Sequence, residues 1–170
     1  MKRNIVLIGM PASGKSTVGK TVAKKYGMKF IDGDTLIEER YGKRLREIIA
    51  ESGNEGFLQV EGSVLSSIEA AHSVIAPGGS CIYEEEAMQH LREIAVVIYL
   101  QTPFERIAER IGDPAQRGVV LPSGYTLLDL YNERTPLCEK YAHFSVDTSK
   151  TSMHGTVEEV YRLFRTGKNL

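Results

Sequence analysis

The feature that most constrains this chain is a buried strand that runs into a glycine-rich loop near the first residue. Residues 5–8 are four consecutive aliphatic side chains, and residues 9–16 read GMPASGKS, which matches the phosphate-loop pattern G-x-x-x-x-G-K-[ST]. Such a loop points backbone N–H groups at phosphate oxygens, and the following helix adds partial positive charge behind them. We therefore expect a nucleotide site here, with Lys15 reaching the β- and γ-phosphates and the Ser16 hydroxyl binding Mg²⁺.

The bulk properties of the chain exclude several other classes of protein. Its 170 residues suit one domain, and the formal net charge of −1 gives no basic balance for nucleic-acid binding. No apolar run approaches the roughly 20 residues that span a bilayer, and the first run is too short for a signal peptide. We expect a cytoplasmic monomer, with one domain over residues 1–170 and neither nucleic acid nor membrane as a partner.

The cysteines and histidines give no sign of a metal or disulfide site. Cys81 and Cys138 are too few and too far apart for a C-x-x-C motif, so we expect two reduced thiols. The four histidines lack metal-ligand spacing, and their expected role is that of surface or hydrogen-bonded core side chains.

The rest of the chain alternates strand and helix patterns. Strands are expected at residues 28–31, 73–76, 95–100 and 144–147, and longer helices at residues 17–26, 55–71, 84–91, 104–111, 125–141 and 156–164. Two short helices, 34–40 and 45–50, precede a turn at 52–54 in which Asn54 is expected to cap the next helix. Gly27 should end the first helix, and Pro103 should occupy the first position of another. This order predicts an α/β fold of three layers, α/β/α, with a parallel sheet.

Two carboxylates, Asp32 and Asp34, follow the second predicted strand, and Gly33 between them should let the chain turn without strain. Ligands of open α/β sheets bind at this carboxyl edge. A carboxylate there can support Mg²⁺ or take the proton of an attacking hydroxyl. The structural alternative is that Asp34 caps the helix that follows, and one side chain can serve both purposes.

Two glycine-rich stretches are candidates for ligand contact. Residues 77–80 read PGGS after the third strand, where a Gly-Gly turn lets the backbone approach a ligand. The structural alternative is that these residues form an ordinary tight turn. Residues 112–124 form the longest irregular stretch and contain Arg117. Beside a phosphate site, such a loop is a candidate lid that excludes water and stabilises transferring charge.

Taken together, these motifs resemble those of the shikimate kinase family, small P-loop kinases of the nucleoside-monophosphate-kinase-like fold, over nearly the whole chain. The resemblance implies a five-stranded parallel sheet in the order 2-3-1-4-5, with ATP and Mg²⁺ as cofactors. It implies catalytic roles for Lys15, Asp34 and Arg117, and Mg²⁺ binding by Ser16 and Asp32. The implied nucleotide contacts are Gly9, Ala12, Ser13, Gly14, Lys15, Ser16, Thr17 and Arg110. The implied acceptor contacts, in and around a region at residues 33–60, are Asp34, Leu58, Gly78, Gly79, Ser80 and Arg134.

The sequence departs from the family pattern on the acceptor side. Residues 57–61 read FLQVE, so Leu58 stands where the family has an arginine that binds the shikimate carboxylate, while its acidic partner Glu61 remains. Ser80 replaces the third glycine of a triplet, and the lid reads RGVVL where the family has R-P-L-L. A charge-assisted hydrogen bond to a carboxylate contributes roughly 1.5–3 kcal/mol, or about 10- to 150-fold in affinity, so the first change alters the acceptor site.

Three functions follow from this pattern. The leading hypothesis is ATP-dependent phosphorylation of a hydroxyl of shikimate, a small hydroxylated anion. Leu58 and Ser80 favour the second, a kinase of the same fold that acts on another small hydroxylated acid or polyol. The third is a nucleotide-binding regulatory protein without kinase activity, but a pure switch would not need Asp34, Arg117 and Arg134.

Overall fold

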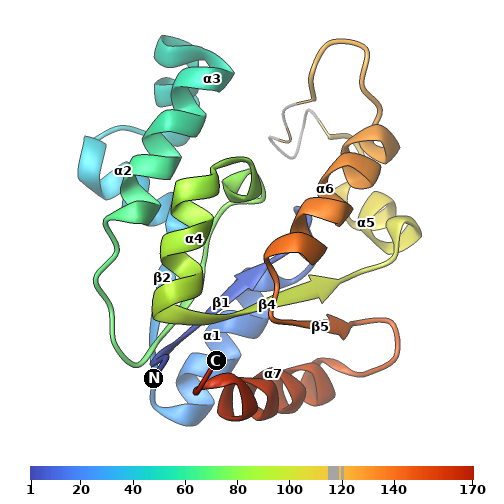
Figure 1. The fold of residues 1–170 in the computed structure, drawn as a ribbon. Coiled ribbons are helices and arrows are strands. Elements are labelled where there is room, and N and C mark those ends of the chain that lie inside the picture. Colours follow the sequence, from blue (N-terminus) through green and yellow to red (C-terminus); the bar gives the residue numbers. More distant parts are fainter. Residues whose placement is uncertain (115–118, 120) are drawn as a thin grey trace.

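A five-stranded parallel sheet forms the centre of the computed structural model, which describes residues 1–114, 119 and 121–170 (Figure 1). The strands are β1 (Asn4–Ile8), β2 (Lys29–Asp32), β3 (Ser73–Ala76), β4 (Ala95–Gln101) and β5 (Phe144–Asp147). They are hydrogen bonded in the order β2-β3-β1-β4-β5, and all four pairings are parallel. The predicted fold class and strand order are therefore confirmed.

Helices cover both faces of the sheet, which explains why β1 is apolar at consecutive positions. Ile5 and Leu7 face α1 (Lys15–Tyr26) and α7 (Met153–Gly167), whereas Val6 and Ile8 pack on the other side. That second face is covered by α3 (Leu45–Ser66), α4 (Glu85–Ile94) and α6 (Leu127–Tyr141). Figure 1 shows α1 and α7 on one side of the sheet and α4 and α6 on the other.

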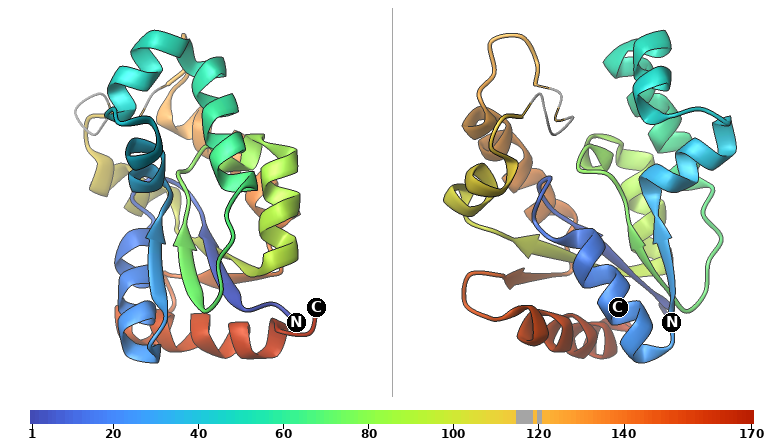
Figure 2. Two further views of the ribbon diagram at one scale, coloured as in Figure 1. Left: turned by 90° about the vertical axis from the view of Figure 1, so that its left-hand side faces the viewer. Right: turned by 180° about the vertical axis from the view of Figure 1, so that it is seen from behind.

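Two arms rise from the carboxyl edge of the sheet, as the views in Figure 2 show. One arm consists of α2 (Gly33–Tyr41) and the first part of α3, and it has a small core of its own around Ile37, Ile48 and Val64. The other consists of α5 (Phe104–Ile111), α6 and residues 121–126, which lead into α6.

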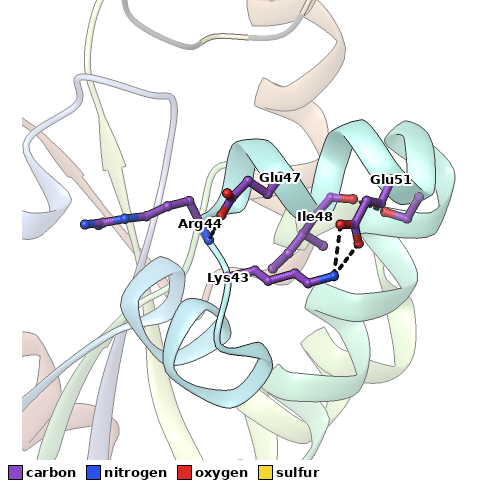
Figure 3. A network of polar contacts seen from close by, with 6 residues as sticks. Lys43, Arg44, Glu47, Ile48 and Glu51 are labelled. Carbon is purple, nitrogen blue, oxygen red and sulfur yellow. Dashed lines mark hydrogen bonds and ion pairs between the residues drawn. The ribbon is translucent and has the colours of Figure 1, made fainter.

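Polar contacts fix the junction between α2 and α3 (Figure 3). The backbone N–H of Arg44 donates to Glu47 Oε2 at 2.7 Å and so caps the start of α3. Lys43 Nζ bonds both carboxylate oxygens of Glu51, at 2.9 and 2.7 Å. These contacts fix the segment that leads into α3, and the backbone N–H of Leu45, which donates to Glu38 Oε1 of α2 at 3.0 Å, joins the two helices.

Most predicted elements are present, but several boundaries were wrong. The turn predicted at residues 52–54 is present as a break at Gly53 (φ 69°, ψ 180°), where two helical segments of α3 meet at a kink. The predicted helix 55–71 ends at Ser66, and the helix predicted from 125 begins at Leu127. Pro103 is the N-cap of α5, not its first helical residue.

The expectations for cysteine and histidine agree with the structure. Cys81 and Cys138 are free thiols, both buried. His90 Nε2 lies 2.8 Å from the Ile68 carbonyl oxygen, and His143 Nδ1 accepts a hydrogen bond from the backbone of Val97. Within the described ranges, no three His, Cys, Asp or Glu side chains gather as a metal cage, and no helix is long and apolar enough to cross a membrane.

Candidate functional site

The phosphate loop connects β1 to α1 with the backbone shape that its motif predicts. Gly14 precedes α1 with φ 97°, a conformation that glycine adopts without strain, and Ala12 also lies in the left-handed region at φ 62°. Lys15 Nζ donates to the carbonyl oxygens of Gly9 and Met10, at 2.9 and 2.8 Å. Burial lowers the pKa of Lys15 to about 8, so the lysine is poised for a partner of opposite charge.

Two further side chains belong to this loop. Arg110, in the last turn of α5, donates through Nη1 to the Ala12 carbonyl oxygen at 2.9 Å. Ser13 is buried, and its hydroxyl has no hydrogen-bond partner among the described residues. An unpartnered buried hydroxyl in a loop of this shape fits an anionic ligand, because it can donate to an oxygen.

A cavity of about 550 Å³ lies beside the loop, between the two arms. Ten residues predicted for the site line it: Ala12, Lys15, Ser16, Asp32, Asp34, Leu58, Gly78, Gly79, Ser80 and Arg134. The remaining predicted nucleotide contacts are not among its lining residues: Gly9, Ser13, Gly14, Thr17 and Arg110. Arg117, the predicted lid arginine, lies outside the described residues.

The two carboxylates at the end of β2 have separate roles, and the structural alternative in which Asp34 caps the helix does not hold. Asp32 is the N-cap of α2, where its Oδ1 accepts a hydrogen bond from the backbone of Thr35 at 3.1 Å. Asp34 lies in the first turn with its side chain open to the cavity. Burial, followed by the charge of Asp32, raises the pKa of the Asp34 carboxyl. Asp34 is thus free of the capping role and available to a ligand.

The glycine between these acids is needed for packing and not, as the sequence suggested, for a turn. Gly33 is the first residue of α2, and a Cβ there would lie 2.8 Å from Pro77 Cα. This close approach brings the end of β2 against the segment after β3. Asp34 and Gly78 therefore face the same part of the cavity.

Glu61, which the sequence marked only as the acidic partner of the family arginine replaced by Leu58, is a buried group of the site itself. It lies on α3 with 1% of its surface exposed, and its Oε2 accepts a hydrogen bond of 2.5 Å from the Ser80 hydroxyl. Its Oε1 has no partner among the described residues. Burial raises the pKa of Glu61 to about 7, because it outweighs the opposing effect of the Ser80 hydrogen bond, and the charge of Asp34 adds to the rise.

Arg134 projects from α6 toward the Gly78–Gly79 segment. Its Nη1 would lie 2.8 Å from a Cβ on Gly79, and its Nε donates to the Tyr83 hydroxyl at 3.4 Å. Tyr83 in turn donates to Glu133, which also accepts a hydrogen bond of 3.0 Å from Tyr125. This network orients the cation. Its signals in the sequence are that Tyr83 closely follows the Gly-Gly turn and that Glu133 precedes Arg134.

One wall of the cavity is apolar. Leu45, Ile49, Phe57 and Leu58 all line it from α3. The half-buried Leu58 therefore presents a hydrocarbon surface at the acceptor end of the cavity, at the position where the family pattern has an arginine. Leu45 and Ile49 were not predicted as site residues, although their helical spacing from each other could have indicated one face.

The hydroxyl of Ser16 and the carboxylate of Asp32 line the same cavity. Oxygen donors of this kind suit Mg²⁺, which is usually held by one or two protein groups together with substrate phosphates. The Thr35 N–H donates to Oδ1 of Asp32, which leaves Oδ2 for a metal shell. The donor set therefore fits the predicted ion.

Comparison with known proteins places this site in a family. The family model described as "Shikimate kinase" matches residues 11–165. A shikimate kinase of Vibrio campbellii is 32% identical over 165 residues, covering 95% of this chain and 96% of the relative. One of Thiobacillus denitrificans is 33% identical over 162 residues, covering 93% and 88%.

The chain belongs to the shikimate kinase family. Its fold agrees: a structure of shikimate kinase from Acinetobacter baumannii in complex with shikimate superposes with a TM-score of 0.86 at 29% identity, covering 99% of this chain and 96% of the other. Shikimate kinase from Aquifex aeolicus gives a TM-score of 0.80 at 29% identity, with 98% of each chain covered. Shikimate kinases are phosphotransferases that act on a hydroxyl group, so this chain is a phosphotransferase with the P-loop kinase fold.

Proposed function

We propose that the protein transfers the γ-phosphoryl group of ATP to a hydroxyl of shikimate. The observation that carries the proposal is the single cavity in which Lys15 and Ser16 of the phosphate loop meet Asp34 and Arg134. A donor site and an acceptor site that share one cavity satisfy the geometric requirement for direct transfer between two bound substrates.

In this reaction Asp34 takes the proton of the acceptor hydroxyl. The acceptor oxygen forms a bond to the γ-phosphorus as the bond to the bridging oxygen of ADP breaks. Lys15 lies beside this site, and its positive charge would stabilise the negative charge spread over the phosphoryl oxygens. Mg²⁺, held by Ser16 and Asp32, would neutralise phosphate charge.

The acceptor would bind between the arms, in the region of residues 33–60 and the Gly78–Gly79 segment. Arg134 supplies a cation for its carboxylate, held in place by Tyr83. Arg110 donates to the phosphate loop, and its role as a nucleotide contact stays a prediction. The role of residues 112–124 as a lid also stays a prediction.

A coupled assay of ADP formation with shikimate tests this function. The protein should show saturable, acceptor-dependent turnover, and Lys15→Ala and Asp34→Asn should each lower it by about 100-fold or more. Lys24→Ala and Glu39→Gln make comparable charge changes on the exposed surfaces of the same two helices and should leave it unchanged. Turnover that is independent of shikimate, or that survives both site variants, would contradict the proposal.

A second candidate function is phosphorylation of a different small hydroxylated acid. It is favoured by the apolar wall at Leu58. Because this wall carries no charge, an acceptor carboxylate would depend on Arg134 among the described lining residues at the acceptor end of the cavity. The same assay with quinate, gluconate and related polyols separates the two. A kcat/KM for one of these compounds that exceeds the value for shikimate would assign the native acceptor to that compound.

A further inference from the structure

A buried hydrogen bond between a serine and a glutamate joins α3 to the segment that follows β3. The Ser80 hydroxyl donates to Glu61 Oε2 at 2.5 Å, although the two residues lie 19 positions apart in the sequence. Oε1 of Glu61 has no partner in the described part of the chain, and none of the ion pairs there includes this carboxyl. Hydrogen bonds from a hydroxyl to a carboxylate are short and about twice as strong as those between neutral groups. Ser80 is therefore the side chain that holds Glu61 in place.

The segment held in this way has few side-chain contacts of its own. Gly78 and Gly79 have no side chains, and a glycine backbone is less restricted than that of other residues. The backbone forms a turn, in which the N–H of Cys81 donates to the Gly78 carbonyl oxygen at 3.3 Å. This hydrogen bond fixes the shape of the turn, whereas the bond from Ser80 to Glu61 fixes where the turn lies relative to α3.

The backbone of this segment also lies close against α3. A Cβ on Gly78 would lie 2.7 Å from Glu61 Oε1. A Cβ on Gly62, the next residue of α3, would lie 2.8 Å from Glu84 Oε2, just beyond the segment. No side chain fits between the helix and the segment at such separations. A shift of the segment therefore requires a shift of α3 or the loss of this contact.

The segment and α3 form neighbouring parts of the cavity lining. Gly79 and Ser80 line the cavity from the segment, and Leu58 lines it from α3. Leu58 lies three residues before Glu61 but has no hydrogen-bond donor for it, so the carboxyl depends on Ser80. On the other side of the segment, Arg134 Nη1 would lie 2.8 Å from a Cβ on Gly79. The distance between the apolar wall and the guanidinium thus depends on where the segment lies.

We propose that Ser80 is a positioning residue for the acceptor. Its hydroxyl, through Glu61, fixes the Gly78–Gly79 segment against α3. The position of the segment in turn sets the width of the acceptor end of the cavity between Leu58 and Arg134. Loss of the hydroxyl frees the segment and weakens acceptor binding, but leaves the phosphate loop unchanged. The binding of the acceptor at this place rests on the proposed function, whereas the anchoring of the segment does not.

The anchoring is measured by ¹⁵N relaxation of the Gly78 and Gly79 amides in the protein without nucleotide or acceptor. Ser80→Ala removes the hydroxyl and should lower the order parameters of both amides from about 0.85, typical of a rigid backbone, toward about 0.6. Ser80→Thr keeps the hydroxyl and should keep the native values. Ser52→Ala is the matched control, because the Ser52 hydroxyl donates at 2.6 Å to the Ile48 carbonyl oxygen within α3.

The effect on the acceptor is measured by steady-state kinetics with shikimate. Ser80→Ala should raise the KM for shikimate by about tenfold or more and leave the KM for ATP unchanged. Ser80→Thr should restore the native KM for shikimate, and Ser52→Ala should not alter it. If Ser80→Ala does not fold, Ser80→Cys takes its place in both measurements, because a thiol is a weak donor of similar size.

Native order parameters for the two amides in Ser80→Ala, or a native KM for shikimate, overturn the proposal. A KM that rises equally for ATP and for shikimate also overturns it, because such a change would indicate a general effect on the fold. Absence of turnover with shikimate in the native protein counts against the proposed function alone, since the relaxation of the two amides still decides whether Ser80 anchors the segment.

Discussion

Lys15 Nζ donates a hydrogen bond of 2.9 Å to the carbonyl oxygen of Gly9, six residues earlier, so the phosphate loop closes on its own lysine. A second hydrogen bond, of 2.8 Å, goes to Met10. The ammonium is desolvated, and its carbonyl partners carry no full negative charge. A nucleotide phosphate would supply that charge, and binding of the nucleotide should therefore be linked to the protonation of Lys15.

This linkage predicts that ATP binding weakens at alkaline pH. Burial lowers the pKa of Lys15 to about 8 in the free protein, and a bound phosphate raises it. The affinity for ATP is therefore highest below pH 8 and falls as pH rises through that value. Isothermal titration should give a loss of up to about tenfold per pH unit above pH 8. Lys15→Arg keeps its charge over this range and should remove the dependence. An affinity of the native protein that is equal at pH 7 and 9.5 would contradict the linkage.

The apolar residue at position 58 gives the second prediction. Leu58→Arg would place a planar cation in the cavity wall and should lower the KM for shikimate by about 10- to 150-fold, as expected for a charged hydrogen bond of roughly 1.5–3 kcal/mol. Steady-state kinetics with shikimate measure it, and Leu58→Met, which keeps the wall apolar, is the matched control. A KM that is equally low in the native chain would mean that Arg134 alone suffices for the carboxylate.

The fold was predictable where local signals coincide with burial. The apolar runs at β1, β3 and β4 and the helix end at Gly27 follow from patterns of a few residues. The break at Gly53 was also predictable, because the Ser-Gly-Asn sequence at residues 52–54 is a local turn signal, and Gly53 adopts a positive φ of 69° there. The strand order came from the family resemblance, since periodicity does not determine which strands are neighbours.

The site residues also fall into those that local sequence signals reveal and those that only the folded structure reveals. Lys15 and Asp34 were found because a loop motif and a strand end mark them in the sequence. Tyr83 was missed, and Glu61 was identified only as the acidic partner of the family arginine, because their contacts reach across the chain: Glu61 bonds Ser80, and Tyr83 bonds Glu133 and Arg134. Such contacts appear only when α3, α6 and the segment after β3 are placed together.

The third prediction concerns stability. In Gly33→Ala the new Cβ would lie 2.8 Å from Pro77 Cα, and backbone atoms cannot move aside cheaply. We expect a loss of about 1–3 kcal/mol in the free energy of unfolding, which lowers Tm by roughly 2–4 °C per kcal/mol. Thermal denaturation measures this change. A variant with the native Tm would show that Pro77 can shift without cost.

The last prediction separates acceptor binding from stability at Gly79. In Gly79→Ala the Cβ would lie 2.8 Å from Arg134 Nη1 and 3.3 Å from Pro11 Cδ. The guanidinium is the end of a flexible side chain and can move, so Tm should change little, but a displaced Arg134 should raise the KM for shikimate by about tenfold or more. The KM for ATP should stay the same, because Gly79 lies on the acceptor side.

Gly27→Ala is the matched control for this variant. No atom lies within 4 Å of a Cβ there, but the residue caps α1 at φ 66°, where a side chain is strained. It should therefore lower Tm by an amount that corresponds to about 1 kcal/mol and leave both KM values unchanged. If Gly79→Ala behaves like Gly27→Ala, with a lower Tm and a native KM for shikimate, then Arg134 does not bind the acceptor carboxylate.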